Sequence, residues 1–174
     1  MPPQTERRRQ RDPEYRALLK LARTTKNGTP DRPLDALQQV AELAQGLTKA
    51  RYAALAVTGE GDAMEGFVVS GLTSEEERKL KAPPQGHGPL GTMRQDGLTV
   101  RIDELGQHAR SFGFPPKHPE MKTLMGVPIW VDGEVRGALY ATDRNGGRPF
   151  RDSDEAMLRV LARHAGNIIT TSWY

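Results

Sequence analysis

The feature that most constrains the fold of this chain is a two-residue turn, Asp132-Gly133, between two apolar runs. Asp-Gly in such a position is a strong β-hairpin signal, because the favoured tight turn needs a positive φ at both central residues. The flanking runs, Leu124–Val131 and Glu134–Asp143, have the length and apolar character of strands. The sequence therefore predicts an antiparallel sheet that contains this hairpin.

The other expected elements fit around such a sheet. Helix starts are marked by proline at the first helical position or by capping patterns, such as Thr73 with Glu76 and Asp152 with Glu155. We expect an α+β fold: an antiparallel sheet of five to six strands, N- and C-terminal helices on one face, and two long ligand-covering loops on the other. The expected helices begin at Pro13, Pro33, Thr73 and Asp152, the further strands cover 52–58, 66–70 and 98–102, and the loops cover 82–96 and 103–123.

Composition excludes several classes of protein. The 174 residues suit one domain with an extra helix or two, and they include no cysteine. Disulfides, thiolate nucleophiles and cysteine-bound metals are therefore ruled out. The chain has no run of about 18 apolar residues and no apolar core for a signal peptide behind its Arg-rich start. We expect a soluble, cytoplasmic protein.

Positive charge is concentrated at the N-terminus. Residues 1–32 carry nine Lys/Arg and four Asp/Glu, which leaves sixteen and eighteen for the rest of the chain. We divide the chain into a basic arm with an N-terminal helix, 1–32, and a single domain, 33–174. An arm of this kind can bind nucleic acid. It is more often a solvated tail, and the tail is the interpretation that we favour.

A stiff loop leads into the hairpin. Three prolines, Pro115, Pro116 and Pro119, surround His118, and the residue before a proline is driven towards an extended backbone. A rigid loop that presents one imidazole beside an apolar strand can fix a ligand, although a loop histidine is more often simply solvated. His87 lies in the other long loop, where it could line an entrance or be exposed.

Strand alternation predicts a wall for that ligand. If the two-residue turn sets the register, Val131 faces Glu134 and Met125 faces Tyr140. Tyr140 would then share one face with Met125, Val127, Ile129 and Ala138, a suitable wall for a flat apolar cofactor. Further candidates for this wall are Phe67, Leu90, Met93, Phe114, Met121 and Leu124.

The residues after the hairpin resemble the Asn-Lys-Phe-Asp-Glu signature of GAF domains. Asn145, Phe150, Asp154 and Glu155 match it, whereas Gly146 stands in place of the lysine. Over residues 33–174, the amino-acid sequence is similar to the first GAF domain of the haem-containing dormancy-survival oxygen and redox sensor histidine kinases. The similar segments are 50–55, 67–68, 70–72, 112–116, 118–119, Met121, 126–128, 137–143, 149–150 and 154–155.

This resemblance implies a GAF fold and a cofactor. His118 takes the position of the proximal haem ligand, and Tyr140 that of the distal tyrosine that hydrogen-bonds the gas. It implies a stand-alone sensory domain, not an enzyme, that binds haem b (heme) and senses a diatomic gas (O2, NO or CO) or redox state. We also expect a homodimer, formed by the terminal helices, and a downstream protein partner that the sequence does not identify.

Two alternatives stay open. The domain could be a haem-free GAF module that binds another small molecule, or one that acts only in protein interaction and dimerisation. GAF proteins that reduce free methionine sulfoxide or attach a bilin need cysteine, which this chain lacks.

Overall fold

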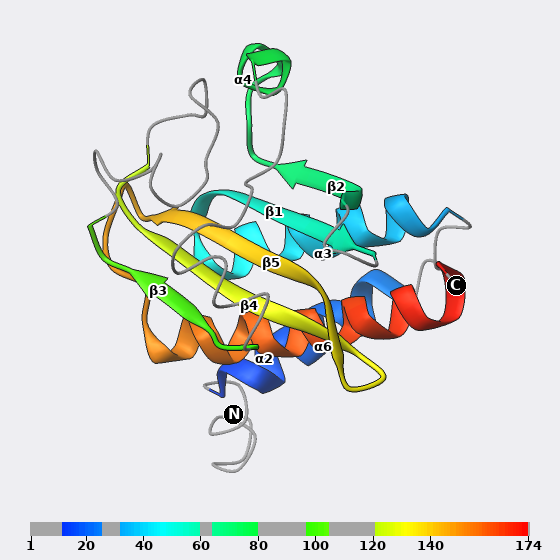
Figure 1. The fold of residues 1–174 in the computed structure, drawn as a ribbon. Coiled ribbons are helices and arrows are strands. Elements are labelled where there is room, and N and C mark those ends of the chain that lie inside the picture. Colours follow the sequence, from blue (N-terminus) through cyan, green and yellow to red (C-terminus); the bar gives the residue numbers. More distant parts are fainter. Residues whose placement is uncertain (1–11, 26–31, 60–63, 80–96, 105–120, 174) are drawn as a thin grey trace.

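A five-stranded antiparallel sheet forms the centre of the protein (Figure 1). The computed structural model describes residues 12–25, 32–59, 64–79, 97–104 and 121–173. The strand order is β2-β1-β5-β4-β3. The strands are β1 (Ala50–Thr58), β2 (Met64–Ser70), β3 (Val100–Ile102), β4 (Leu124–Val131) and β5 (Glu134–Arg144). The helices are α2 (Pro13–Thr25), α3 (Pro33–Thr48), α4 (Ser74–Lys79) and α6 (Asp152–Ser172).

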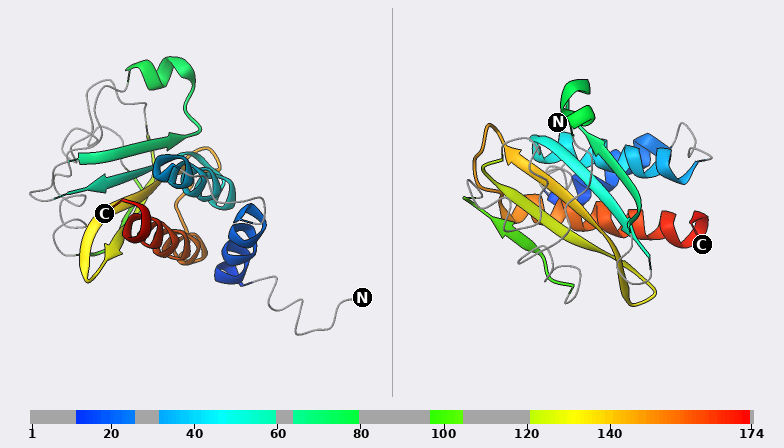
Figure 2. Two further views of the ribbon diagram at one scale, coloured as in Figure 1. Left: turned by 90° about the vertical axis from the view of Figure 1, so that its right-hand side faces the viewer. Right: turned by 45° about the horizontal axis from the view of Figure 1, so that its top comes forward.

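Helices cover one face of the sheet in two layers (Figure 2). α3 and α6 pack directly on the strands, and α2 packs on the outer side of α6 and α3. This arrangement confirms the expected α+β fold with terminal helices on one face. Apolar side chains from both layers are buried together, and their removal from water is the main force that holds the layers together. The main core includes Leu37, Val40, Leu55, Val57, Met125, Val127, Leu139, Met157 and Leu161.

Two of the expected helix starts have the predicted caps. The backbone N–H of Glu14 donates to Asp12 Oδ1 at 3.0 Å. Thr73 and Glu76 exchange hydrogen bonds of 3.1 and 3.2 Å between each side chain and the other's backbone N–H. Each cap satisfies backbone donors that the first turn of a helix would otherwise leave unpaired.

The predicted cap of α6 is wrong. Asp154, not Glu155, closes the box, because its carboxylate accepts the backbone N–H of Arg151 at 2.8 Å. Asp152, the expected cap, has an exposed side chain that instead contacts Arg101 at 3.0 Å. Asp154 is fully buried beside Arg144 of β5 as well as Arg151, and this tertiary contact with Arg144 favours Asp154 as the residue that closes the box.

The hairpin turn is as predicted, but the pairing of β4 with β5 beyond the turn is not. Asp132 and Gly133 have φ of 50° and 79°, and Val131 pairs with Glu134. The register then shifts between Ile129 and Trp130, so that Ile129 pairs with Gly137. β5 thus contains one extra residue, a β-bulge. A one-residue shift moves every later side chain to the other face relative to its expected partner.

The bulge overturns the predicted wall. Met125 pairs with Ala141, and Val127 pairs with Leu139. Both therefore lie in the main core beneath the helices, as does Ile129. Tyr140 pairs instead with Gly126, and it shares its face with Leu124 and Ala138. The prediction that Met125, Val127 and Ile129 line the same wall as Tyr140 is wrong.

The terminal helices use most of their apolar residues inside the domain. On the C-terminal helix, which we expected at a dimer interface, Ile168 and Ile169 are buried in the main core. Trp173 is partly buried, and its indole N–H donates to Glu65 at 3.0 Å. On α2, Leu18 remains 55% exposed. Dimerisation stays a prediction, and any such interface depends more on α2 than on the end of α6.

Among the helices of the described ranges, none has both the length and the apolar character needed to cross a membrane.

Candidate functional site

A second apolar cluster lies on the sheet face opposite the long helices. In Figure 1 this face of the sheet is turned towards the viewer, and α3 and α6 lie behind the strands. The cluster is buried, although α2, α3 and α6 all lie on the other side. Its members are Tyr52, Ala54, Ala56, Val100, Met121, Leu124, Ala138 and Tyr140, with Phe67, Val69, Leu72 and Ile102 partly buried at its margin.

Tyr140 stands among unusually short side chains. Its cross-strand partners are Ala54 on β1 and Gly126 on β4. Two residues along β5, Ala138 pairs with Ala56. We call Ala54, Ala56, Gly126 and Ala138 the alanine floor. Protein interiors are normally packed to high density, so short side chains of this kind let the groups that cover this face approach the sheet closely.

The second tyrosine of this face is held by a sulfur contact. The Tyr52 hydroxyl donates to Met121 Sδ at 2.9 Å, and both side chains are buried. Burial raises the pKa of Tyr52 far above its usual value, and the nearby Asp143 carboxylate adds to this, so the hydroxyl stays protonated. The contact fixes Met121, just before β4, against β1. Sequence reasoning missed Tyr52, although its alternation with Ala54 and Ala56 places it on this face.

Asp143 holds the chain that enters β4. Its Oδ1 accepts the backbone N–H groups of Lys122 at 2.6 Å and Thr123 at 3.0 Å. Its own N–H donates to the Thr123 carbonyl at 3.0 Å. We call these three bonds the Asp143 clamp. Asp143 is buried and has a φ of 55°, a left-handed conformation that aspartate tolerates better than most residues. The clamp ties the segment after the proline-rich loop to β5, three residues beyond Tyr140.

The residues of the signature connect β5 to α6. Asp154 is fully buried and lies 3.3 Å from Arg151 Nη2 and 3.8 Å from Arg144 Nε. Because a buried carboxylate needs a paired charge, these two arginines stabilise Asp154 in its ionised form. Phe150 is buried in the main core, and Asn145 adopts a φ of 45° in the turn after β5.

The predicted site residues fall into three groups. Tyr140, Met121 and Leu124 lie on the face opposite the helices, and Phe67 lies at the margin of that cluster. Met125 and Val127 lie on the helix side. His118, Leu90, Met93 and Phe114 lie outside the described residues, as do the whole of the loop 82–96 and residues 105–120 of the loop 103–123.

Within the ranges that the structure describes, no three His, Asp or Glu side chains gather closely enough to hold a metal ion. His164 is half-buried on α6, where burial lowers the pKa of its imidazole. It therefore lies on the helix side of the sheet, away from Tyr140.

A family model of the GAF domain matches residues 32–170. The chain belongs to the GAF domain family. Its fold is similar to the GAF domain of a phosphoenolpyruvate-protein phosphotransferase from Acinetobacter, at 18% identity and a TM-score of 0.66 over 92% of each chain. The GAF domain of the corresponding Coxiella burnetii protein gives 18% identity and a TM-score of 0.64, over 90% of this chain and 92% of that one.

A third similar structure is a GAF domain from Synechocystis, solved in its photoproduct state. It gives 11% identity and a TM-score of 0.61, over 82% of this chain and 96% of the other. At these identities the likeness shows the fold alone. The expected GAF fold is confirmed, and the domain is a sensory or regulatory module.

Proposed function

We propose that this GAF domain binds haem b against the alanine floor, with His118 as the axial ligand and Tyr140 as the hydrogen-bond donor to a diatomic gas. The observation that carries the proposal is the position of Tyr140 between Ala54 and Gly126. Haem supplies an iron atom whose sixth position is open to O2, NO or CO when one histidine binds it. The protein supplies the apolar surface, the axial imidazole and one hydroxyl.

The described residues of the face fit a flat apolar group. The floor consists of short side chains, and the residues around it are apolar apart from the hydroxyls of Tyr52 and Tyr140. Of the two buried tyrosines on this face, Tyr52 donates to Met121 Sδ, and Tyr140 is the one at the position of the distal tyrosine in the resemblance. One hydrogen bond from Tyr140 to the gas contributes about 1 kcal/mol, enough for several-fold discrimination between gases but not for cofactor binding.

Chain connectivity limits how far His118 can be from this face. Met121 is fixed to Tyr52, and the next two residues are fixed by the Asp143 clamp. His118 precedes Met121 by three residues. A three-residue span reaches at most about 11 Å, so the histidine backbone stays within that radius of Met121. The motif resemblance and this short chain connection both favour His118 as the axial ligand.

The test is a haemin titration of the full chain, followed by its visible spectrum. We expect saturable binding with a Soret band, and we expect His118→Ala to abolish the band. His164→Ala is the matched control, because it removes an imidazole on the helix side. A wild-type protein with no saturable haemin binding, or a His118→Ala protein with an unchanged spectrum, would contradict the proposal.

Tyr140→Phe separates gas recognition from cofactor binding. We expect haemin affinity to stay within a few-fold of wild type, because the substitution removes only a hydroxyl. The dissociation rate of O2 from the reduced complex should rise several-fold, whereas CO, a poorer hydrogen-bond acceptor, should respond less. Equal changes in the dissociation rates of O2 and CO would show that Tyr140 is not the hydrogen-bond donor to the gas.

A second candidate is a haem-free module that binds a different flat molecule on the same floor. What favours it is that the described residues of the floor are wholly apolar and specify no iron. Under this alternative, haemin leaves the thermal unfolding midpoint unchanged, whereas another flat metabolite raises it. Ala54→Leu should then abolish that rise.

A further inference from the structure

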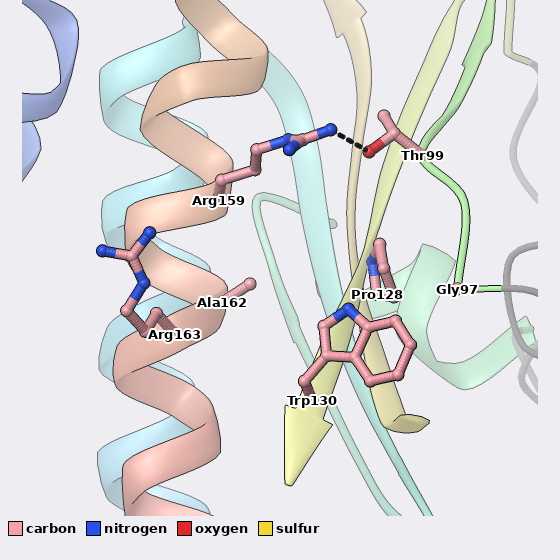
Figure 3. A pocket seen from close by; sticks show the side chains of 7 residues that line it. All are labelled: Gly97, Thr99, Pro128, Trp130, Arg159, Ala162 and Arg163. Carbon is pink, nitrogen blue, oxygen red and sulfur yellow. Dashed lines mark hydrogen bonds between the residues drawn. The ribbon is translucent and has the colours of Figure 1, made fainter. Parts of the chain in front are cut away.

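A cavity of about 250 Å³ lies at the edge of the sheet, beside the point where β3 begins (Figure 3). One side is formed by the chain before β3, at Gly97 and Thr99. The other sides are formed by Trp130 on β4 and by α6. The cavity shares no residue with the alanine floor, so it is independent of the proposed haem site.

Two arginines of α6 border this cavity one helical turn apart. Arg159 and Arg163 are four residues apart, so they start from neighbouring positions on the helix surface. No carboxylate is present among the described lining residues. Glu155 lies 3.8 Å from Arg159 Nε in a solvent-accessible pair, which neutralises little of the charge.

The two guanidinium groups lie differently. Arg159 reaches across the cavity and donates to Thr99 Oγ1 at 3.2 Å (Figure 3). Arg163 lies along the outer side of α6, with its guanidinium turned away from Trp130. It makes no hydrogen bond or ion pair with the described residues. A rotamer change brings such a long side chain towards an anion at modest cost.

Trp130 provides a flat apolar surface at the same place. Its side chain is 51% exposed, an unusual position for the largest apolar side chain. Gly97, with a φ of +68°, lies against the indole, and a Cβ built on it would be 2.1 Å from the ring. Only glycine lets the chain before β3 pass this close, so the indole is held in place while much of its surface stays open.

We propose that this cavity binds a small aromatic anion, a single-ring carboxylate or phosphate monoester. The ring stacks on Trp130, and the anionic group is bound by Arg159 and Arg163. Guanidinium groups match carboxylate and phosphate oxygens in geometry as well as charge. A volume of about 250 Å³ is below that of sites for drug-sized ligands, which limits the occupant to about one ring.

The test is isothermal titration of the full chain with phenyl phosphate. We expect saturable binding with one site per chain. Phenol, which keeps the ring without the anion, and inorganic phosphate, which keeps the anion without the ring, should each bind at least about tenfold more weakly. Equal affinity for phenyl phosphate and phenol, equal affinity for phenyl phosphate and inorganic phosphate, or no saturable binding would overturn the proposal.

Variants locate the binding. Arg159→Gln should lower the affinity about tenfold or more, and Arg163→Gln should lower it several-fold, since that side chain must first change rotamer. Arg23→Gln, which removes the same charge from the last turn of α2, is the matched control and should leave the affinity unchanged. Unchanged affinity in Arg159→Gln, or an equal loss in the Arg23→Gln control, would refute the assignment to this cavity.

Fluorescence gives a second readout. The chain has two tryptophans, so in a Trp173→Phe background all indole emission comes from Trp130. Phenyl phosphate should change that emission with the same midpoint as the titration of the wild type. His118→Ala should leave both midpoints unchanged, which distinguishes failure of this proposal from failure of the haem proposal.

Discussion

Replacing Asp143 tests whether the clamp holds the start of β4. Its Oδ1 accepts two backbone N–H groups, from Lys122 and Thr123, and the side chain is buried. Hydrogen bonds to a charged group contribute about 1.5 kcal/mol or more each, so their loss costs about 3 kcal/mol. Asp143→Ala also places alanine at a φ of 55°, which adds about 1 kcal/mol.

Three substitutions separate these contributions. Asp143→Ala should lower the free energy of unfolding by about 4 kcal/mol, and Asp143→Gly by about 3 kcal/mol, because glycine accepts a positive φ without strain. Asp143→Asn should cost only about 1 kcal/mol. Both N–H groups bond to one oxygen, and an amide oxygen can take its place with loss of the charge alone.

The assay is urea unfolding followed by circular dichroism, with the melting temperature as a check. For a domain of this size, 4 kcal/mol corresponds to a decrease of about 8–16 °C. Asp152→Ala is the control, because that carboxylate is exposed and its contact with Arg101 should contribute less than about 1 kcal/mol. If Asp143→Ala matched this control, or Asp143→Asn cost as much as Asp143→Ala, the clamp would not have the role assigned to it.

Three further predictions address the site and its surroundings. Ala54→Leu should fill the floor beside Tyr140 and abolish haemin binding, while overpacking costs about 1–3 kcal/mol; a Soret band in a folded variant would contradict this. Tyr52 should remain un-ionised in the folded protein well above pH 10, so part of the phenolate absorbance at 295 nm should appear only on unfolding, and this part should be smaller in Tyr52→Phe. Because the unfolded chain binds fewer protons above its tyrosine pKa, the contribution of Tyr52 to stability is full below about pH 10 and falls as the pH rises further, and Tyr52→Phe should reduce this fall. Gly97→Ala should drive the Trp130 indole from its position, which a shift of its emission would report in the Trp173→Phe background; unchanged emission would show that the close approach is not required.

The sequence predicts the elements better than their pairing. The Asp132-Gly133 turn and the bounds of β4 are correct because turn chemistry and apolar runs are local signals. The bulge in β5 is not local. Gly137 lies against the Ala56 carbonyl, and a Cβ there would approach it to 2.3 Å. An isolated glycine within a strand can mark such a bulge. Whether a bulge forms there depends on how β1 pairs with β5, which the sequence does not show.

The site residues likewise divide into those that local sequence patterns place and those that depend on contacts between distant residues. Tyr140 and its alanine neighbours on β1 could be placed by alternation within single strands. The contact from Tyr52 to Met121 and the bonds from Asp143 to Lys122 join residues 69 and 21 positions apart, respectively. The pairing of the buried Asp154 with Arg144 likewise depends on the tertiary structure, because the two residues lie on different elements.

Adjacent residues at the end of β5 hold two separate parts of the molecule. Asp143 binds the chain that enters β4, and Arg144 binds the Pro149 carbonyl at 2.8 Å and contacts Asp154 at the start of α6. α6 has 21 residues and is therefore about 30 Å long. A rotation of about 5° at its first turn would displace its far end by roughly 2.6 Å over that length. The start of β4 and the first turn of α6, whose far end carries Trp173, are thus joined through a single peptide unit of β5.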